Sequence, residues 1–186
     1  MKFTKTYIPY GAYWSTPFTK WQGSLSSISS VLLASQATRT ALAARGVSPE
    51  VFHSIALGIT VPQQSSFYGP PWMAGMIGAE GISGPMVAQA CATGARVLAT
   101  AGAEVELTSE HTALTVTTDR CSNGPHLYYP APNGPGGTGK AEDWVMDNFG
   151  NDPWARNAMI ETAENVAKEA GISREEQDAL TLRRHE

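Results

Sequence analysis

Cysteine is scarce in this chain, which has only Cys91 and Cys121 in 186 residues. Two cysteines in a chain of this length do not make a disulfide framework. Long hydrophobic runs are also missing, because no apolar stretch approaches the roughly 20 residues that span a bilayer. The first residues, MKFTKTYIPYGAYW, lack the continuous apolar core of a signal peptide. These absences predict a soluble, cytoplasmic protein.

Positive charge is sparse as well. The chain has 13 Lys and Arg against 17 Asp and Glu, a net charge of −4, and no basic run. A nucleic-acid surface is therefore not expected. No cluster of His, Cys and Asp shows the spacing of metal ligands, so we expect no metal site. What is present is a globular balance, with 42% hydrophobic and 16% charged residues.

The first part of the chain alternates between strand-like and helix-like patterns. Residues 26–45 place apolar side chains on one helical face, and Gly46 follows as a stop signal. Residues 92–105 form a second helical pattern, rich in alanine. Strands are predicted between and after these helices, at residues 53–62, 86–89 and 112–118. This order predicts an α/β layered fold with crossover connections.

After residue 120 the composition changes to turn residues, including YPAPNGPGGTGKAEDW. A segment of this kind predicts an excursion away from the core. Helical patterns return at residues 155–170 and from Ser173 onward, where SREE resembles a capping box with Glu176. The last helical pattern is still running at Glu186, so we expect the second region to be incomplete at its C-terminus.

Cys91 lies where a short apolar run meets a helical pattern, in GPMVAQACATGARVLATAGAEVEL. One interpretation is a small buried packing residue, as most free cysteines are. The other is a nucleophile at a helix N-terminus, where unpaired N–H groups and the helix dipole favour a thiolate. Small neighbours such as Ala92 and Gly94 would let a substrate approach the sulfur. Spacing alone leaves both interpretations open.

Several ordered segments resemble the thiolase superfamily. VAQACATGARVLATAGAEVE is similar to its nucleophile segment, in which Cys-x-x-Gly begins a helix after a short strand. STPFTKWQGSL resembles the opening of these enzymes, and CSNGPH resembles the entry into their loop domain. MIETAENVAKEAGISREEQDALTLRRHE resembles the loop-domain helices. The resemblance therefore extends over nearly the whole chain.

The resemblance implies a thiolase-like αβαβα layered fold, with residues 1–118 as the N-terminal core half and 119–186 as part of a loop domain. It implies an acyl-CoA C-acyltransferase that cleaves 3-ketoacyl-CoA thiolytically or runs the reverse Claisen condensation. Cys91 would be the nucleophile that carries the acyl group, and Met159 would lie beside the acyl pocket. Coenzyme A thioesters would be substrates, with no bound cofactor.

The sequence departs from the family pattern at several positions. Ala158 stands where many thiolases have a histidine, Ser15 replaces a common arginine, and Val116 with Thr117 replaces a glycine pair. The Gly-His-Pro motif and the second cysteine of a Cys-x-Gly-Gly segment do not occur. Each of the remaining candidates has the wrong sequence context and is interpreted as structural or surface-exposed: His53, His111, His126, His185 and Cys121.

These gaps predict negligible turnover by the chain alone. We expect the missing acid–base groups to come from a C-terminal half or a partner subunit. The resemblance also implies a homodimer or tetramer, and it permits a small acyl-CoA-handling partner with a zinc ribbon.

Three other interpretations remain. A ketoacyl synthase-type condensing enzyme shares the nucleophile pattern ACATG, and a thiolase-like protein without catalytic activity would share the fold. The third is a nucleotide-binding loop at GPGGTGK (134–140), which fits the G-x-x-x-x-G-K spacing. Against it, Ala141 stands where Mg²⁺ binding needs Ser or Thr, and no strand pattern precedes the loop.

Overall fold

The computed structural model describes residues 2–186. The chain divides into two compact units, Met1–Pro125 and His126–Glu186, and each is described by itself. We call them unit 1 and unit 2. The assignment of these units to a core half and a loop domain stays a prediction.

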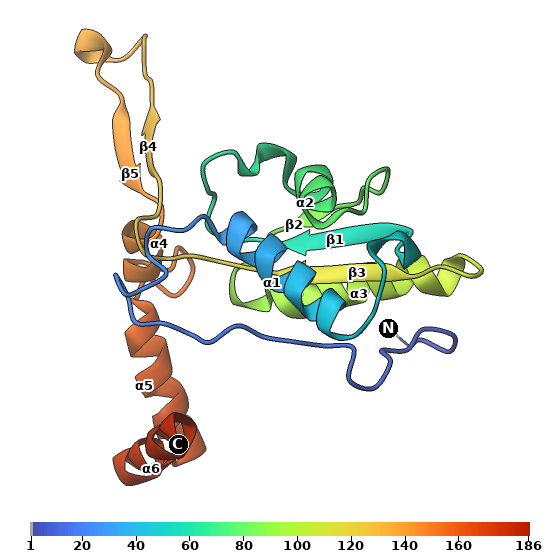
Figure 1. The fold of residues 1–186 in the computed structure, drawn as a ribbon. Helices are drawn as coiled ribbons and strands as arrows, with labels where there is room; N and C mark the ends of the chain where they lie inside the picture. The colour runs from blue at the N-terminus through green and yellow to red at the C-terminus, as the bar shows by residue number, and fades with distance from the viewer. Residues whose placement is uncertain (1) are drawn as a thin grey trace. The chain divides into compact units, whose positions relative to one another are not determined.

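Unit 1 combines three helices with a small sheet (Figure 1). The helices are α1 (Ser30–Ala44), α2 (Gly69–Ile77) and α3 (Thr93–Leu107). The strands are β1 (Ser54–Gly58), β2 (Met86–Val87) and β3 (Ala113–Thr117). Short 3₁₀ turns lie at η1 (Pro49–Val51), η2 (Ser66–Tyr68) and η3 (Ala90–Ala92). The strands and helices expected before residue 120 are thus confirmed, with ends a few residues shorter than expected in most cases.

All three strands are parallel, in the order β2-β1-β3. Leu57 pairs with Met86 on one side of β1 and with Val116 on the other. In open parallel sheets, ligands bind outside the carboxyl ends of the strands, near the point where strand order reverses. The carboxyl edge of this sheet, where β1, β2 and β3 end, is therefore the place to look for a site.

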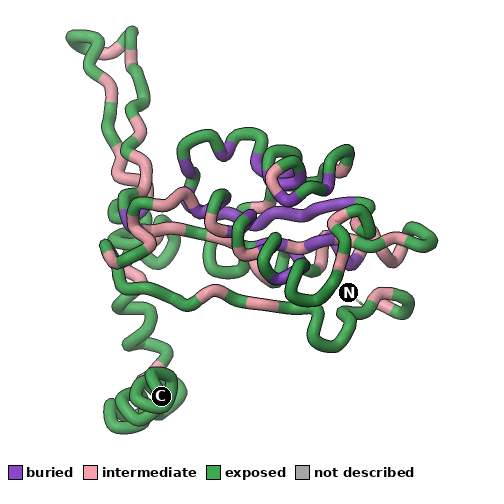
Figure 2. The backbone as a smooth tube through the Cα atoms, viewed as in Figure 1, coloured by how far each residue is buried: buried purple, intermediate pink, exposed green. Residues whose placement is uncertain are grey.

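The central strand β1 is buried along its whole length, which Figure 2 shows as a continuous purple run. Its large side chains, Ile55 and Leu57, pack with residues of α1 and α2. Its small residues point to the opposite face, where Ala56 packs with Val97 and Ala101 of α3. Because this face carries only small residues, α3 lies close to the sheet. A methyl group on Gly58 would come within 2.7 Å of Val97 Cγ2 and 2.8 Å of Thr93 Cγ2.

Helix α2 was not predicted from the sequence. It begins at Gly69 and carries Pro70 and Pro71 in its first turn. Backbone N–H groups in the first turn have no partner within the helix, so proline costs no hydrogen bond there. It ends at Gly78, which has a left-handed conformation with φ of 82°. The two prolines mask a helix because they are usually taken as breakers.

The N-terminal segment before α1 is mostly extended and is held to the ends of two helices. Glu106, in the last turn of α3, accepts hydrogen bonds from Thr4, Lys5 and Thr6. These bonds, led by the hydroxyl of Thr4, lower the pKa of Glu106 to about 2. Arg45, at the end of α1, donates to the carbonyl oxygens of Gly11 and Tyr13.

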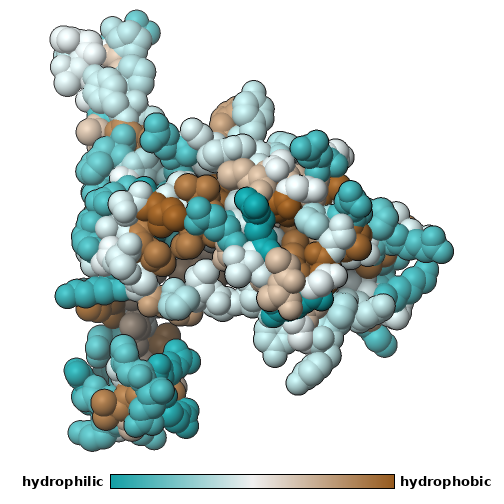
Figure 3. Space-filling view, viewed as in Figure 1, coloured by the Kyte–Doolittle hydropathy of each residue, from teal (hydrophilic) through white to brown (hydrophobic). Residues whose placement is uncertain are grey.

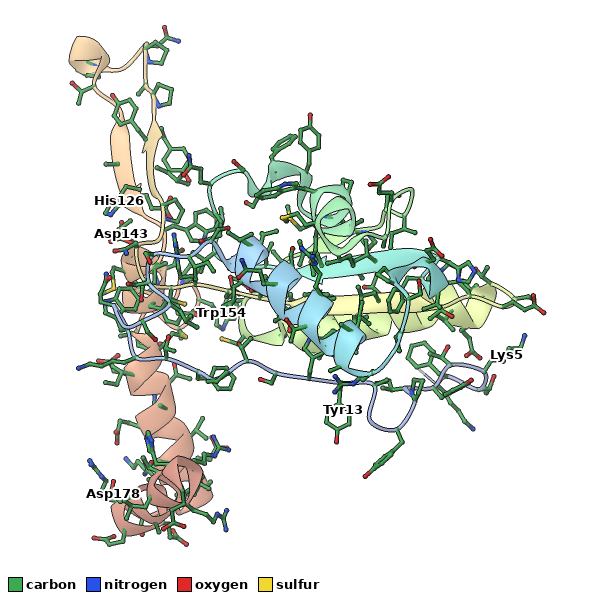
Figure 4. All side chains as sticks on the ribbon, in the orientation of Figure 1. Lys5, Tyr13, His126, Asp143, Trp154 and Asp178 are labelled. Atoms are coloured by element: carbon green, nitrogen blue, oxygen red, sulfur yellow. The ribbon has the colours of Figure 1, made fainter. Side chains whose placement is uncertain are left out.

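Unit 2 begins with a hairpin of β4 (His126–Tyr129) and β5 (Lys140–Asp143), which pair antiparallel. His126 and Asp143 face each other at its open end, with Nε2 3.9 Å from Oδ2 (Figure 4). The turn η4 (Pro135–Gly137) lies at its tip. The strand β5 begins at Lys140, the last residue of GPGGTGK, whereas a phosphate-binding loop of this type leads into a helix. The nucleotide-binding interpretation of residues 134–140 is therefore wrong.

The rest of unit 2 is helical, with α4 (Met146–Gly150), α5 (Met159–Ala170) and α6 (Arg174–His185). The predicted capping box of α6 is present, because Ser173 and Glu176 bond each other's backbone N–H groups. Hydrophobic side chains on these helices, such as Ile160, Val166 and Leu182, are exposed among polar ones (Figure 3). Among the described residues, no helix has the length and apolar character needed to cross a membrane.

Candidate active site

Cys91 lies in the turn η3, between the end of β2 and the start of α3. Its side chain is exposed, which removes the interpretation of a buried packing residue. The residue before it, Ala90, has φ of +43°, a region that residues with a Cβ rarely adopt. Strain of this kind persists only where surrounding contacts enforce it.

Thr93, the first residue of α3, supplies those contacts. Its buried hydroxyl accepts a hydrogen bond of 2.7 Å from the backbone N–H of Gln89. The same hydroxyl lies 2.7 Å from the carbonyl oxygen of Ala90, to which it can donate. The side chain of Thr93 thus bonds the backbone of the turn that carries Cys91, and α3 begins at the same residue.

The space beside Cys91 is open. Gly94 lies one residue into α3 after Thr93, and a methyl group built on it would meet nothing closer than Thr117 Cγ2 at 4.0 Å. Packing therefore does not require glycine at this position, in contrast to Gly58. A broad groove of unit 1 reaches Cys91 and Gly94 and is bordered by the N-terminal segment, α1, α3 and β3.

Cys121 lines the same groove and is half-buried. Burial raises the pKa of the Cys121 thiol, and the negative charges of Asp119 and of an ionised Cys91 raise it further. The sequence context suggested a structural or surface residue, whereas the structure places this thiol at the same edge of the sheet as Cys91. With a raised pKa it stays protonated at neutral pH.

Asp119 follows β3 at this edge. Its carboxylate accepts bonds of 3.0 and 2.7 Å from the backbone N–H groups of Thr60 and Val61, which follow β1. Partial burial of the carboxylate raises the pKa of Asp119, although these hydrogen bonds oppose the shift. Sequence reasoning missed Asp119 and Thr60, yet both lie two residues past the end of an observed strand, after Thr117 and Gly58. Parallel strands bring such positions together.

The four histidines lie elsewhere. His53 and His111 precede β1 and β3, so they lie at the amino edge of the parallel sheet, opposite Cys91. Nε2 of His111 lies 2.8 Å from Oγ of the buried Ser54 and 3.5 Å from Glu104. His126 and His185 are exposed residues of unit 2. No histidine of the described chain therefore lies at the carboxyl edge of the unit 1 sheet beside Cys91.

Met159, the other predicted site residue, is the first residue of α5 and is half-buried within unit 2. Ala158 precedes it as the N-cap of the helix, with extended backbone. Its predicted role beside an acyl pocket stays a prediction. Among the described residues, no group of three or more His, Cys, Asp or Glu side chains is arranged to hold a metal ion.

A thiol before a helix at the carboxyl edge of a parallel sheet agrees with the comparison with protein families. The model of the thiolase N-terminal domain matches residues 12–186. The chain belongs to the thiolase family. No curated protein sequence matches it.

Solved thiolases share its fold. An acetyl-CoA acetyltransferase from Syntrophomonas wolfei is 31% identical, with a TM-score of 0.74, over 90% of this chain and 43% of its own. Human mitochondrial 3-ketoacyl-CoA thiolase in complex with CoA is 26% identical, with the same TM-score and coverage. An acetyl-CoA acetyltransferase from Bacillus anthracis, 23% identical with a TM-score of 0.72, shares the fold over 88% of this chain and 42% of its own. The chain therefore spans less than half the length of these thiolases.

Proposed function

We propose that this chain carries the nucleophile of a thiolase-type acyl-CoA C-acyltransferase, and that Cys91 is that nucleophile. The observation that carries the proposal is the exposed thiol in a strained turn at the start of α3, inside the segment that the thiolase family matches. The thiolase from human mitochondria has been solved with CoA. Coenzyme A thioesters are the substrates we assign to this chain.

The chemistry follows from the thiol. The Cys91 sulfur attacks the carbonyl carbon of an acyl-CoA, the thioester bond to CoA breaks, and CoA leaves as a thiolate that takes up a proton. The backbone N–H of Cys91 is one candidate donor to the oxyanion that forms on the way. Transfer of the acyl group to a second thioester gives condensation, and attack by CoA gives thiolysis. Covalent storage of the acyl group lets two successive substrates use one site.

The groove supports an extended ligand. Its volume of about 2170 Å³ exceeds the roughly 300–1,000 Å³ of pockets for compact ligands. Cys91 and Gly94 lie on its wall, where the absence of a side chain on Gly94 leaves room for an acyl group. Ala158 in place of a histidine favours acyl groups larger than acetoacetyl, and profiling with acyl-CoAs of increasing length tests this. Strict preference for acetyl and acetoacetyl groups would contradict it.

Within the described part of unit 1, no histidine lies at the carboxyl edge of the sheet to act as the base of the reaction. We propose that a C-terminal half or a partner subunit supplies it, so that the chain alone accepts an acyl group but does not turn over. A homodimer or tetramer, and a small partner that handles acyl-CoA, belong to the same proposal. Measurable thiolysis by the chain alone would contradict it.

The proposal is tested by mixing the full chain with acetyl-CoA and mapping the acetyl group by mass spectrometry. Trypsin cleaves after Arg45, Arg96, Arg120 and Lys140, so the two cysteines lie in separate peptides, 46–96 and 121–140. We expect acetylation in the first peptide, its loss in Cys91→Ala, and its retention in the matched control Cys121→Ala. A wild-type chain that takes up no acetyl group would favour a thiolase-like protein without catalytic activity. Acyl uptake only from an acyl carrier protein would favour the ketoacyl synthase interpretation.

A further inference from the structure

A continuous series of polar contacts joins the ends of two strands to the turn before α3. It begins at Asp119, after β3, whose two carboxylate oxygens lie 3.0 and 3.1 Å from the backbone nitrogen of Thr60. The carboxylate also accepts a hydrogen bond of 2.7 Å from the backbone N–H of Val61. The loop after β1 is thus tied to the loop after β3.

The series continues to the nucleophile turn. Oγ1 of Thr60 lies 3.1 Å from Oγ1 of the buried Thr93. Thr93 accepts from Gln89 N–H and lies in hydrogen-bond distance of the Ala90 carbonyl. Cys91 is the next residue along the chain.

The donors and acceptors of this series are consistent. The single hydrogen of the Thr93 hydroxyl goes to the Ala90 carbonyl at 2.7 Å, so Thr93 acts as an acceptor toward its other partners. The Thr60 hydroxyl is then the donor in its contact with Thr93, which also accepts from the Gln89 N–H. Both hydroxyl hydrogens therefore point toward the turn, and Asp119 holds the loop that carries Thr60 through its backbone N–H groups.

We propose that Asp119, Thr60 and Thr93 form a positioning relay that enforces the strained conformation of Ala90 and so sets the direction of the Cys91 thiol. Its importance for acyl transfer rests on the proposed function, but its effect on the turn does not. The left-handed φ of Ala90 is unfavourable unless surrounding contacts enforce it. A turn under such strain relaxes when its contacts are removed, and Cys91 moves with it.

Thr60 is the position to test, because it lies between the carboxylate and Thr93 and is only half-buried. Thr60→Val keeps the shape and removes the hydroxyl, whereas Thr60→Ser keeps the hydroxyl. Thr100→Val is the matched control, since the Thr100 hydroxyl bonds Arg96 O on the same helix without reaching the turn. Asp119→Asn is a second variant that places an amide donor where backbone N–H groups need an acceptor.

The first readout is hydrogen exchange of the Gln89 amide by NMR, with the Leu57 amide of β1 as a reference for global stability. We expect about five-fold faster exchange of Gln89 in Thr60→Val and Asp119→Asn, the effect of one hydrogen bond of ordinary net strength. Thr60→Ser should restore the wild-type rate, and Thr100→Val should leave it unchanged. Equal exchange of Gln89 in wild type and Thr60→Val, or equal acceleration at Gln89 and Leu57, would overturn the relay.

The second readout separates positioning from exposure. Acetyl transfer from acetyl-CoA to Cys91 should fall about five-fold in Thr60→Val, while alkylation by iodoacetamide, which needs only an exposed thiol, should not change. Wild-type chain that is not acetylated would overturn the proposed function alone, and the exchange of Gln89 would still decide the relay. Acetyl transfer at the wild-type rate in Thr60→Val would overturn the link between relay and thiol.

Discussion

The two edges of the sheet in unit 1 are both polar, but their polar groups bond different things. At the carboxyl edge, Asp119 and Thr93 bond mainly backbone groups of loops and leave the thiol of Cys91 exposed. At the amino edge, His111 bonds the side chain of Ser54, lies 3.5 Å from that of Glu104 and is itself largely buried. The first arrangement fixes the backbone around a free reactive group. In the second arrangement the polar side chains bond each other, so none of them is left free for a substrate.

Helix α3 connects these two edges, since it begins beside Cys91 and ends beside Glu106. Its start carries the positive end of the helix dipole, which favours negative charge, and its end carries the negative end. A Ser, a His and a Glu come together at the amino edge, but both partners lie near the same nitrogen of His111. A catalytic triad needs the two ring nitrogens to serve different partners. The difference between the two edges shows that residue types alone do not identify an active site.

The largest effect we predict comes from moving α3 at the carboxyl edge. In Gly58→Ala the new methyl group lies 2.7 Å from Val97 and 2.8 Å from Thr93, so the first turn of α3 must shift. We expect a loss of about 1–3 kcal/mol in the free energy of unfolding, typical of overpacking, and weaker acetylation of Cys91. Urea unfolding and the acetyl-CoA assay measure the two effects.

Gly94→Ala is the matched control on the same helix, because its methyl group meets only an ordinary contact at 4.0 Å. Alanine in a helix is favoured over glycine by about 0.5–1 kcal/mol, so the free energy of unfolding should not fall. If Gly58→Ala and Gly94→Ala destabilised the chain equally, close packing of α3 at the carboxyl edge would not explain the need for Gly58.

A smaller effect is expected at the amino edge. His111→Ala removes the partner of the buried Ser54 hydroxyl, which lies 2.8 Å from it. We expect the free energy of unfolding to fall by about 1–2 kcal/mol, the cost of leaving a buried polar group without its bond. The double variant with Ser54→Ala should recover part of this loss, as measured by a double-mutant cycle. Reduced acetylation of Cys91 in a stably folded His111→Ala would contradict the separation of the two edges.

Apart from α2, the sequence predicted the helices and strands of unit 1 well because their apolar periods are distinct. The strand at residues 112–118 alternates clearly and is found as β3, Ala113–Thr117. The hairpin of unit 2 was not predicted, because β4 and β5 are short, largely exposed strands without an apolar face. Their pairing comes from backbone bonds, which leave no hydrophobic pattern in the sequence.

The candidate site shows the same division. Cys91 was found through the local pattern of a strand, a small-residue turn and a helix. Asp119 and Thr60 are 59 residues apart in the sequence, and their contact depends on the register of β1 with β3, in which Gly58 pairs with Thr117. Register is a property of the folded sheet, so a local pattern could indicate the edge but not the relay that crosses it.

The smallest effect we predict is a difference in pH dependence between two carboxylates near opposite ends of α3. The hydrogen bonds from Thr4, Lys5 and Thr6 lower the pKa of Glu106 from 4.5 to about 2, so its stabilisation is complete above pH 4.5 and is lost as the pH falls toward 2. Burial raises the pKa of Asp119 above its ordinary value of 3.8, so its ionisation costs stability, and this cost appears as the pH rises through the raised pKa.

An NMR titration can follow both carboxylates, because the amides of Lys5 and Thr6 bond Glu106 while those of Thr60 and Val61 bond Asp119. The shifts of the Thr60 and Val61 amides should change at a higher pH than those of the Lys5 and Thr6 amides. Glu106→Gln should abolish only the transition seen at the Lys5 and Thr6 amides. Titration of both pairs at one pH would mean that the two carboxylates experience the same environment, and the contrast between the edges would then not extend to their charges.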